Sequence, residues 1–427
     1  MLEFVAFGSI ATGVLYAQHR YFNKKTTQHY VEKVFRNTGL AMPDRDKNGN
    51  VLSVKFPKYI GKKTHDWGVS YKYRLPVGMT YEMITETKPI DHILESMFNR
   101  DVLIKDEKYN HISINVYKER LSNNIPYSLD WLEKCKHYKV VIGHDHHGLI
   151  YHDFNLVPHM IIGGMTRYGK SVVMKLLITQ LVLRQQGAKF HLFDLKGGLA
   201  FNRFKKLPQV HSVSRNVKES LRDLKNLKNA IIKRQLYFEE KGYEDIGEAI
   251  KNKEHFDRDI IVIDEASVLA PQSKSDEDRN KCKEILEFIA QVAGGLGYNL
   301  IMCSQYPTGD ILPRQVKQNS DARLSFRLPT TTASNVILDE PGAEKIEFGF
   351  RGRAIYKADQ KRLIQVPYMS NDMIDELIKP LEVKKDEQDG ERIFDTSDVS
   401  EAGSSDTLPV AAYTPFGEQQ KRQQGFG

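Results

Sequence analysis

Cysteine is scarce in this sequence of 427 residues: there are three, and no two of them form a CxxC pair. Disulfide scaffolds and structural zinc sites need several closely spaced cysteines, so the sequence excludes both. A reducing compartment is the default expectation for such a chain. Hydrophobic residues make up 40% and charged residues 27% of the sequence. These fractions are near globular averages, which excludes a wholly disordered chain, a collagen and a coiled-coil rod.

The charge of the chain is unevenly distributed. The sequence has 62 Lys and Arg against 55 Asp and Glu, a formal net charge of +7. Residues 384–427 hold five basic and nine acidic residues, which leaves +11 on residues 1–383. A basic body with a mildly acidic tail suits a polyanionic partner, although surplus Lys and Arg also serve solubility alone.

Long hydrophobic runs are absent apart from one short run at the N-terminus. Residues 2–17 are nearly all apolar or small, interrupted by Glu3, and basic residues follow the run. The run is shorter than the ~20 residues that span a bilayer core, and it lacks the basic start and the cleavage site of a secretory signal. We favour a single-pass anchor in the cell membrane over 1–25, with the rest of the chain in the cytoplasm because the positive charge follows the run. An amphipathic or buried helix is the alternative.

The rest of the chain divides into three parts. Short alternating runs between turn residues predict a small α+β module over 26–136, in which no chemistry is visible. Residues 384–427 are rich in Asp, Glu, Ser, Gly and Gln without periodicity, which predicts a disordered tail. Between them, over 137–383, apolar strands alternate with amphipathic helices. This alternation predicts an α/β domain, with a parallel sheet flanked by helices on both faces.

A complete phosphate-binding motif lies in this third part. Residues 164–171, Gly-Met-Thr-Arg-Tyr-Gly-Lys-Ser, match GxxxxGK[ST] between an apolar strand and a helix. Backbone N–H groups of such a loop surround the β- and γ-phosphates, and the helix N-terminus adds partial positive charge. Lys170 is expected to neutralise phosphate oxygens and Ser171 to bind Mg²⁺. The predicted nucleotide-binding residues are Gly164, Met165, Thr166, Arg167, Tyr168, Gly169, Lys170 and Ser171. A glycine-rich turn without a ligand is the alternative.

Two acidic residues follow a later apolar strand. Asp264 and Glu265 come directly after 260–263, so they lie at the C-terminal edge of the sheet, where ligands bind in such folds. There Asp264 would hold Mg²⁺ through water, and Glu265 would be the base that orients attacking water. An acidic pair after a strand also occurs as a helix cap. Combined with the phosphate-binding motif, the pair predicts a nucleoside triphosphatase.

Motifs on both sides of the phosphate-binding loop resemble the FtsK/SpoIIIE family of DNA translocases. They lie in 138–143, 157–164, 193–197 (Phe-Asp-Leu-Lys-Gly), 304–307 (Ser-Gln-Tyr-Pro) and 321–345. The similarity covers about 135–370, and within the family the chain looks most like the short coupling ATPases of Gram-positive conjugative elements. The resemblance implies a RecA-like P-loop domain, ATP as the nucleotide, DNA as a partner, conjugation or relaxase-type proteins as further partners, and a homo-hexamer.

The resemblance also assigns residues. Gln305 matches the sensor of the γ-phosphate, although a polar residue that ends a buried strand is the alternative. Asp194 and Lys196 match the family's Asp-x-Lys, for which an ordinary surface ion pair is the alternative. His159 has a counterpart in the family, but we expect it to be structural.

Three departures from the family pattern stand out. The family has an arginine, supplied to the neighbouring subunit, where this sequence reads Ala-Gly-Gly-Leu-Gly over 293–297, and Tyr306 replaces a second arginine. We predict Arg323 as the catalytic arginine, with Arg351 and Arg353 as other candidates; without one, hydrolysis is expected to be slow. Residues 384–427 are too few and too polar for the winged-helix module of large translocases, so we expect no sequence-directed polarity through such a module.

These observations lead to one function and two alternatives. The leading hypothesis is a membrane-anchored, ATP-driven DNA translocase that delivers DNA to a conjugative transfer channel. A related ATPase for DNA packaging or segregation is the first alternative. The second is a nucleotide-gated membrane scaffold that recruits a DNA-processing complex without translocating.

Overall fold

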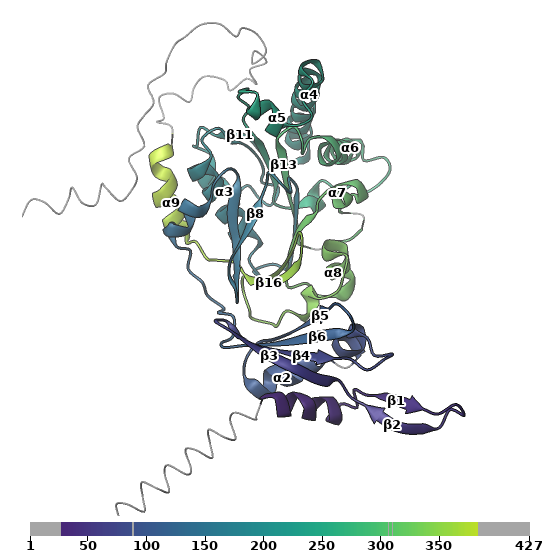
Figure 1. The fold of residues 1–427 in the computed structure, drawn as a ribbon. Helices are drawn as coiled ribbons and strands as arrows, with labels where there is room; N and C mark the ends of the chain where they lie inside the picture. The colour runs from purple at the N-terminus through teal and green to yellow at the C-terminus, as the bar shows by residue number, and fades with distance from the viewer. Residues whose placement is uncertain (1–26, 88, 306, 310, 383–427) are drawn as a thin grey trace, which may run out of the picture. The chain divides into compact units, whose positions relative to one another are not determined.

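The computed structural model describes residues 27–87, 89–305, 307–309 and 311–382 (Figure 1). The expected membrane anchor at 1–25 and the expected tail at 384–427 lie outside these residues. Within the described part of the chain, none of the helices combines the length and the apolar character needed to cross a membrane.

Residues 27–117 form a small antiparallel sheet with helices packed on it. Its strands lie in the order β3-β4-β6-β5, and β1 and β2 form a separate two-stranded ribbon. The core contains Phe35, Tyr73, Leu94 and Ile114. The strands are β1 (Met42–Arg45), β2 (Val51–Lys55), β3 (Lys58–His65), β4 (Gly68–Arg74), β5 (Val102–Glu107) and β6 (His111–Tyr117), and the helices are residues 27–37, the π-helix η1 (Met83–Thr87) and α2 (Ile90–Phe98).

A second, larger sheet of ten strands includes β9, the strand that leads into the phosphate-binding motif. Its strands are β7 (Lys139–Asp145), β8 (Gly148–Asp153), β9 (Met160–Gly163), β10 (Lys189–Phe193), β11 (Val210–Ser214), β12 (Asp259–Ile263), β13 (Tyr298–Ser304), β14 (Ala322–Phe326), β15 (Arg353–Lys357) and β16 (Lys361–Gln365). Seven α-helices accompany it in the described residues: α3 (Lys170–Arg184), α4 (Val217–Lys241), α5 (Ile246–Lys251), α6 (Glu277–Val292), α7 (Arg314–Gln318), α8 (Thr331–Leu338) and α9 (Asn371–Ile378). Short 3₁₀ turns are η2 (Leu129–Lys134), η3 (Asn202–Phe204), η4 (Ala266–Val268), η5 (Ala343–Lys345) and η6 (Lys379–Leu381).

The strand directions correct one prediction. The order is β11-β10-β12-β13-β9-β14-β15-β16-β7-β8, and the first six strands are parallel, as predicted. The other four are antiparallel to their neighbours, so the predicted parallel sheet accounts for six of the ten strands and the sheet as a whole is mixed. Only three residues connect β15 to β16, too few for the crossover that a parallel pair requires.

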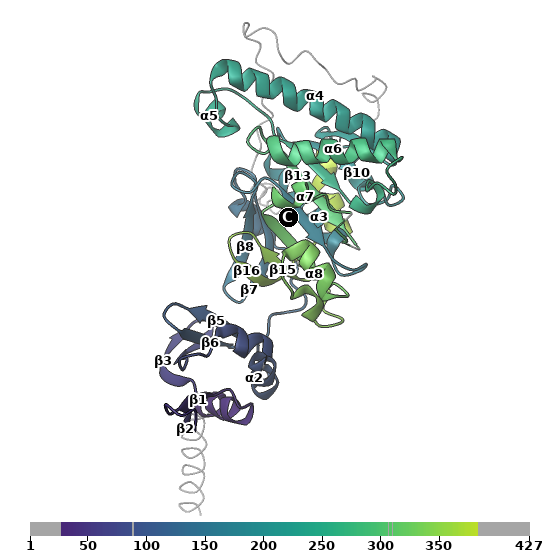
Figure 2. The ribbon, with the colours of Figure 1, turned by 90° about the vertical axis from the view of Figure 1, so that its right-hand side faces the viewer.

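Helices cover both faces of the large sheet, as the sequence predicts. In β12, Ile260 and Val262 face one core and Ile261 and Ile263 the other, because successive side chains of a strand point to opposite faces. The first core includes residues of α3 and α9, and the second includes residues of α4, α6 and α8 (Figure 1). Figure 2 shows α4 and α6 side by side over the second face.

The predicted boundary between the small module and the ATPase domain, at 136/137, stays a prediction. Tyr127 and Cys135, which precede this boundary, pack in the core of the large sheet with residues of α3 and α9. The connection between the module and the sheet is therefore itself packed against the larger domain.

A buried glutamine fastens α3 to β7. The side-chain amide of Gln180 accepts a hydrogen bond from the Val141 N–H (2.8 Å) and donates to the Val141 carbonyl (2.9 Å). Gln180 is fully buried, so these bonds form away from water. The glutamine thus gives β7 the pairing that a neighbouring strand would otherwise supply.

Replacing this glutamine is expected to destabilise the domain. Gln180→Leu keeps the apolar volume but leaves the N–H and carbonyl of Val141 without partners, which lowers the free energy of unfolding by about 2–4 kcal/mol. Urea unfolding followed by circular dichroism measures the loss. Gln318→Leu, at an exposed position of α7, is the matched control and should leave the midpoint unchanged. Equal midpoints for Gln180→Leu and the wild type would contradict this account.

Candidate nucleotide-binding site

The motif at 164–171 forms the loop between β9 and α3, and one phenylalanine, Phe326, accounts for both of its glycines. Gly164 (φ +148°) and Gly169 (φ +129°) have backbone conformations that other residues rarely adopt. A Cβ atom at Gly164 would lie 2.6 Å from Phe326 Cβ, and one at Gly169 would lie 2.7 Å from Phe326 Cε1. Phe326 is fully buried at the end of β14. The loop is therefore held against β14 in a shape that only glycine permits at these two positions.

Lys170 lies in the first turn of α3 and folds back over the loop. Its ammonium donates hydrogen bonds to the carbonyls of Gly164 and Met165, the latter at 2.9 Å. Burial lowers the pKa of Lys170 to about 8. A buried cation next to a helix N-terminus attracts a polyanion strongly, because both favour negative charge at the same point. The geometry is that expected for a phosphate site.

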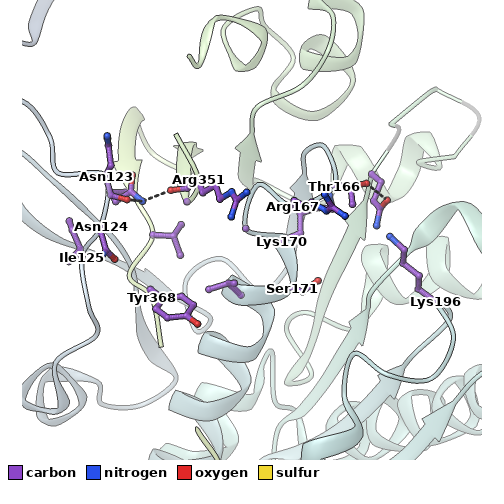
Figure 3. Close-up of a pocket in the computed structure, with 16 residues that line it drawn as sticks. Asn123, Asn124, Ile125, Thr166, Arg167, Lys170, Ser171, Lys196, Arg351 and Tyr368 are labelled. Atoms are coloured by element: carbon purple, nitrogen blue, oxygen red, sulfur yellow. Dashed lines mark hydrogen bonds between the residues drawn. The ribbon is translucent and has the colours of Figure 1, made fainter. Parts of the chain in front are cut away.

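A cavity of about 490 Å³ opens beside this loop. The volume is in the usual range for small-molecule sites. Figure 3 shows its lining, in which no acidic residue takes part. The lining residues are Asn123, Asn124, Ile125, Thr166, Arg167, Gly169, Lys170, Ser171, Val172, Lys196, Gln305, Arg351, Gly352, Gln365, Val366 and Tyr368. Four of them are cations, Arg167, Lys170, Lys196 and Arg351, so the cavity suits an anion of high charge.

The predicted loop residues divide into two groups. Thr166, Arg167, Gly169, Lys170 and Ser171 line the cavity. Tyr168 and Met165 instead direct their side chains into the core, and the backbone N–H of Met165 donates to the Arg327 carbonyl (2.9 Å). The side chains of these two residues serve packing.

Gln305 connects the phosphate-binding loop to the acidic pair. Because β13 lies between β9 and β12, the end of β13 is flanked by the loop on one side and by the acids on the other. The Thr166 hydroxyl donates to Gln305 Oε1 (2.9 Å), and the Gln305 backbone N–H donates to Glu265 Oε1 (3.3 Å). The three residues form one hydrogen-bonded row across the strand ends. Gln305 thus lies beside the loop, and its role as a sensor of the γ-phosphate stays a prediction.

The acidic pair is buried at the end of β12. Asp264 and Glu265 are 5% and 7% exposed, and neither lines the cavity. Asp264 Oδ1 accepts the Leu195 N–H (2.9 Å), and burial, with the negative charges of Asp194 and Glu265, raises the pKa of Asp264 to about 6. Glu265 also accepts a hydrogen bond from the Ser267 hydroxyl (2.9 Å). The helix-cap alternative does not describe this pair, because neither side chain caps η4, the turn that follows.

The residues present fit a magnesium ion bound with ATP. Magnesium commonly takes one or two protein oxygens and completes its shell with water and phosphate. Ser171 lies at the start of α3 beside the loop, and Asp264 follows β12. In the described part of the chain there is no cluster of three or more His, Cys, Asp or Glu side chains that would hold a metal without the nucleotide.

Arg323, predicted as the catalytic arginine, lies in the interior of its own subunit. It is 8% exposed, and its guanidinium donates to the carbonyls of Ser320 (3.1 Å), Ile337 (3.1 Å) and Lys317 (2.8 Å) and pairs with Asp339. All three guanidinium nitrogens thus have partners. Releasing them to reach a neighbouring subunit would leave buried carbonyls unpaired. This network argues for a structural role and against the predicted catalytic one.

The two other candidate arginines differ from each other. Arg353 is buried at the start of β15, where it donates to Gln365 Oε1 (3.1 Å) and to the Leu121 carbonyl (2.7 Å), so it too is held within its own chain. Arg351 is exposed and lines the cavity (Figure 3). Of the three candidates, only Arg351 lies beside the phosphate-binding loop.

The position where the family arginine is missing lies in the turn after α6. A Cβ atom at Gly294 would lie 2.7 Å from Pro158 Cγ, whereas at Gly295 the nearest atom, Asp245 Cβ, is 3.9 Å away. Gly294 is therefore a packing requirement, and Gly295 is not. Nearby, His159 accepts a hydrogen bond from the Leu300 N–H (3.1 Å), and burial lowers the pKa of His159 to about 4, in keeping with its expected structural role.

Several cavity residues escaped the sequence analysis. Asn123, Asn124 and Ile125 lie far before the motif, and Tyr368 far after it, so no local pattern announces them. Lys196 was matched only to the family's Asp-x-Lys. The preceding Asp194 is fully buried and accepts the N–H groups of Ala200 and Phe201, so it orders the loop that carries Lys196 and is not part of a surface ion pair.

The fold and the site together define a P-loop ATPase domain. The chain belongs to the FtsK/SpoIIIE family, whose sequence pattern matches residues 130–358, and the predicted membership is confirmed. It is 27% identical over 269 residues to a protein named DNA translocase FtsK from Leptospira interrogans, a match that covers 58% of this chain and 27% of that protein. It is 26% identical over 243 residues to DNA translocase SpoIIIE from Bacillus subtilis, covering 53% and 30%. The matched region spans less than a third of each of these curated relatives.

Solved structures share the fold. The structure of the pCW3 conjugation coupling protein TcpA, in a monomer form with ATPγS, has a TM-score of 0.57 at 22% identity and covers 82% of this chain and 98% of that one. ATPases 2 and 3 of EssC from Geobacillus thermodenitrificans have a TM-score of 0.53 at 16% identity, covering 61% of this chain and 51% of that one. These TM-scores establish a common α/β fold with a large mixed sheet, and at identities this low they establish the fold alone.

The affinity for ATP is expected to fall as pH rises. The ammonium of Lys170 attracts phosphate only when it is charged. Because its pKa in the empty site is about 8, it is mostly charged at pH 7 and mostly neutral at about pH 9. Titration calorimetry with ATP is done between about pH 7.5 and 9, because the phosphates complete their last ionisation near pH ~6 and keep a constant charge in this window. It should show weaker binding at higher pH, and uptake of protons when ATP binds. Lys170→Met should bind weakly and without this slope. A pH-independent affinity of the wild type in this window would refute the lowered pKa of Lys170, whereas wild-type affinity in Lys170→Met would refute its role in phosphate binding.

Proposed function

We propose that this protein is an ATP-driven DNA translocase that serves as the coupling ATPase of a conjugative element. The observation that carries the proposal is the hydrogen-bonded row from Thr166 through Gln305 to Glu265. It joins a phosphate-binding loop to a buried acid, the arrangement needed to report the γ-phosphate to the group that orients water. Family relatives named DNA translocases, and the fold shared with a conjugation coupling protein, support the choice of DNA and of conjugation.

In this proposal each residue of the site has one task. Lys170 and the N-terminus of α3 hold the β- and γ-phosphates, and Gln305 positions the γ-phosphate next to Glu265. Glu265 orients the attacking water and accepts its proton. Ser171, and Asp264 through water, would hold the Mg²⁺, which would neutralise charge on the phosphates. Arg351 is the proposed arginine for the transition state, because it is the candidate that lines the cavity.

The DNA contact in this proposal is mainly electrostatic. Residues 1–383 carry a net charge of +11, which favours contacts to phosphate over readout of base edges. Affinity for DNA should then fall steeply with salt and depend little on sequence. A homo-hexamer around the strand, a single-pass anchor at 1–25 in the cell membrane and contacts to relaxase-type proteins complete the proposal.

A nucleotide-gated scaffold is the second candidate. The observation in its favour is the glycine pair at 294–295, where the family has its arginine. A missing arginine costs on the order of 10³–10⁵ in hydrolysis rate in related enzymes. A scaffold would bind ATP and recruit a DNA-processing complex with little turnover, whereas a translocase, including one for packaging or segregation, must hydrolyse ATP faster when DNA is present.

Glu265→Gln should bind ATP normally and lose DNA-stimulated hydrolysis by at least about a hundred-fold, because an amide does not act as a base. The amide oxygen still accepts from Gln305 and Ser267, so the geometry of the site is kept. The ATPase rate is measured against DNA concentration at two salt concentrations, with Glu284→Gln at an exposed position of α6 as the control. A wild-type rate indifferent to DNA at low salt would favour the scaffold. A fully active Glu265→Gln would remove Glu265 from the mechanism.

Gly295→Arg should raise the DNA-free ATPase rate by at least about ten-fold, since it restores a cation where the family supplies one to the neighbouring subunit. The space around Gly295 is open enough for a side chain. Its φ is not positive, so other residues adopt this backbone conformation without strain. Gly295→Ala is the backbone control and should not raise the rate. Gly294→Arg should instead lower the melting temperature, because its Cβ collides with Pro158. If Gly295→Arg leaves the rate unchanged, the missing arginine is not what limits hydrolysis.

A further inference from the structure

The segment Leu121–Tyr127, here called the strap, leads from the small module into the ATPase domain. It runs alongside the residues that follow β16. The Tyr368 N–H donates to the Ile125 carbonyl (2.8 Å), and the Tyr127 N–H donates to the Tyr368 carbonyl (2.9 Å). Pro126 and Tyr368 form a parallel bridge. The strap is thus fixed by main-chain hydrogen bonds, which do not depend on the Tyr368 side chain.

A buried arginine and a buried glutamine form hydrogen bonds to the strap. Arg353 donates to the Leu121 carbonyl (2.7 Å) and to Asn123 Oδ1 (2.9 Å), and Gln365 donates to the Asn123 carbonyl (3.1 Å). Both side chains are nearly fully buried. Burying a guanidinium is costly unless its donors are satisfied, so the strap is part of the fold of the ATPase domain and not a loose linker.

Backbone hydrogen bonds connect the strap to the phosphate-binding loop. The Gly352 N–H donates to the Tyr168 carbonyl (2.9 Å), and the Val366 N–H donates to the Gly352 carbonyl (2.8 Å). Tyr168 belongs to the loop, and Val366 lies two residues before Tyr368. The phosphate-binding loop is therefore connected to the strap through Gly352 and the 365–368 segment.

The cavity has two chemically different halves. Arg167, Lys170, Ser171 and Lys196 form the cationic half described above. Figure 3 shows Asn123, Asn124, Ile125 and Tyr368 on the opposite side of the cavity, with Arg351 between the two groups. The ring of Tyr368, which is 52% exposed, and the side chain of Ile125 give this second half an apolar surface, and Val172 and Val366 also line the cavity.

The second half also offers one free amide. Asn123 is held by Arg353, but within the described residues the hydrogen bonds of Asn124 are those of its backbone to Ser122. A side-chain amide has donors and an acceptor, which can pair with the polar edge of a nucleobase. A flat aromatic base with a polar edge matches a half-cavity made of an aromatic ring, aliphatic side chains and an amide.

We propose that the strap and Tyr368 form the base-binding half of the nucleotide site, so that a purine nucleoside triphosphate bridges the strap and the phosphate-binding loop. The base stacks on Tyr368 and its edge meets Asn124. Nucleotide binding then stabilises the strap, and through it the connection to the small module, because a ligand stabilises whatever state binds it. This inference rests on the proposed ATPase function and assigns to it a nucleoside-reading element that the phosphate-binding motif does not contain.

The test compares ATP with inorganic tripolyphosphate, which has the phosphates and no nucleoside. Calorimetric titration of the full chain with each ligand and Mg²⁺ is done for the wild type, Tyr368→Ala, Tyr368→Phe, Asn124→Ala and Lys170→Ala. Tyr368→Ala should weaken ATP binding on the order of ten-fold and leave tripolyphosphate binding unchanged. Tyr368→Phe should keep the wild-type affinity, Asn124→Ala should weaken ATP alone, and Lys170→Ala should weaken both ligands. Hydrogen exchange at strap amides such as that of Tyr127 should slow with ATP and not with tripolyphosphate.

The outcomes separate this inference from the function on which it rests. A wild-type chain that binds neither ligand refutes the ATPase proposal itself. A wild-type chain that binds both, together with Tyr368→Ala that binds ATP as tightly, refutes the base-binding half alone. Equal loss of both ligands in Tyr368→Ala would also refute it, since the tyrosine would then act on the phosphate half.

Discussion

The place of β13 between β9 and β12 is the constraint on which the site depends. It brings the end of β13 next to the phosphate-binding loop and next to the acidic pair at once, and Gln305 bonds to both neighbours. Side-chain contacts of this kind require strand ends at one level of the sheet, which parallel strands provide. Phe326 at the end of β14 adds the second support, because it holds the glycines of the loop from the other side.

The sequence predicts this half of the domain well because its signals are local. An apolar strand, a glycine-rich loop and a helix in succession are enough to place Lys170, and an apolar run is enough to place Asp264. The strands β15 and β16 were missed because they complete the sheet by pairing with strands from other parts of the chain, β14 and β7. The sequence also contains no sign of the network around Arg323, because its partners, such as the Ile337 carbonyl and Asp339, are set by tertiary packing and not by spacing.

Arginine has two distinct uses in this domain. Arg323 and Arg353 are buried and act as fasteners that satisfy several carbonyls at once, a task suited to a planar group with five donors. Arg167 and Arg351 line the cavity and contribute charge. A count of arginines near the motifs does not distinguish these uses, since both kinds occur within a few residues of each other at 351 and 353. Burial distinguishes them at once.

The pairing of β16 with β7 has a consequence for synthesis on the ribosome. The hairpin of β7 and β8 is among the first parts of the ATPase domain to leave the exit tunnel, whereas β16, which pairs with His144 of β7 through Gln365, is among the last. The same delay applies to the bonds from Arg353 and Tyr368 to the strap. Contacts between such distant segments form only after the intervening chain is made, and closing so long a loop is slow. The His144 end of the hairpin therefore lacks its partner until β16 is made, and the nascent chain acquires its phosphate-binding loop well before the cavity residues that lie at 351–368.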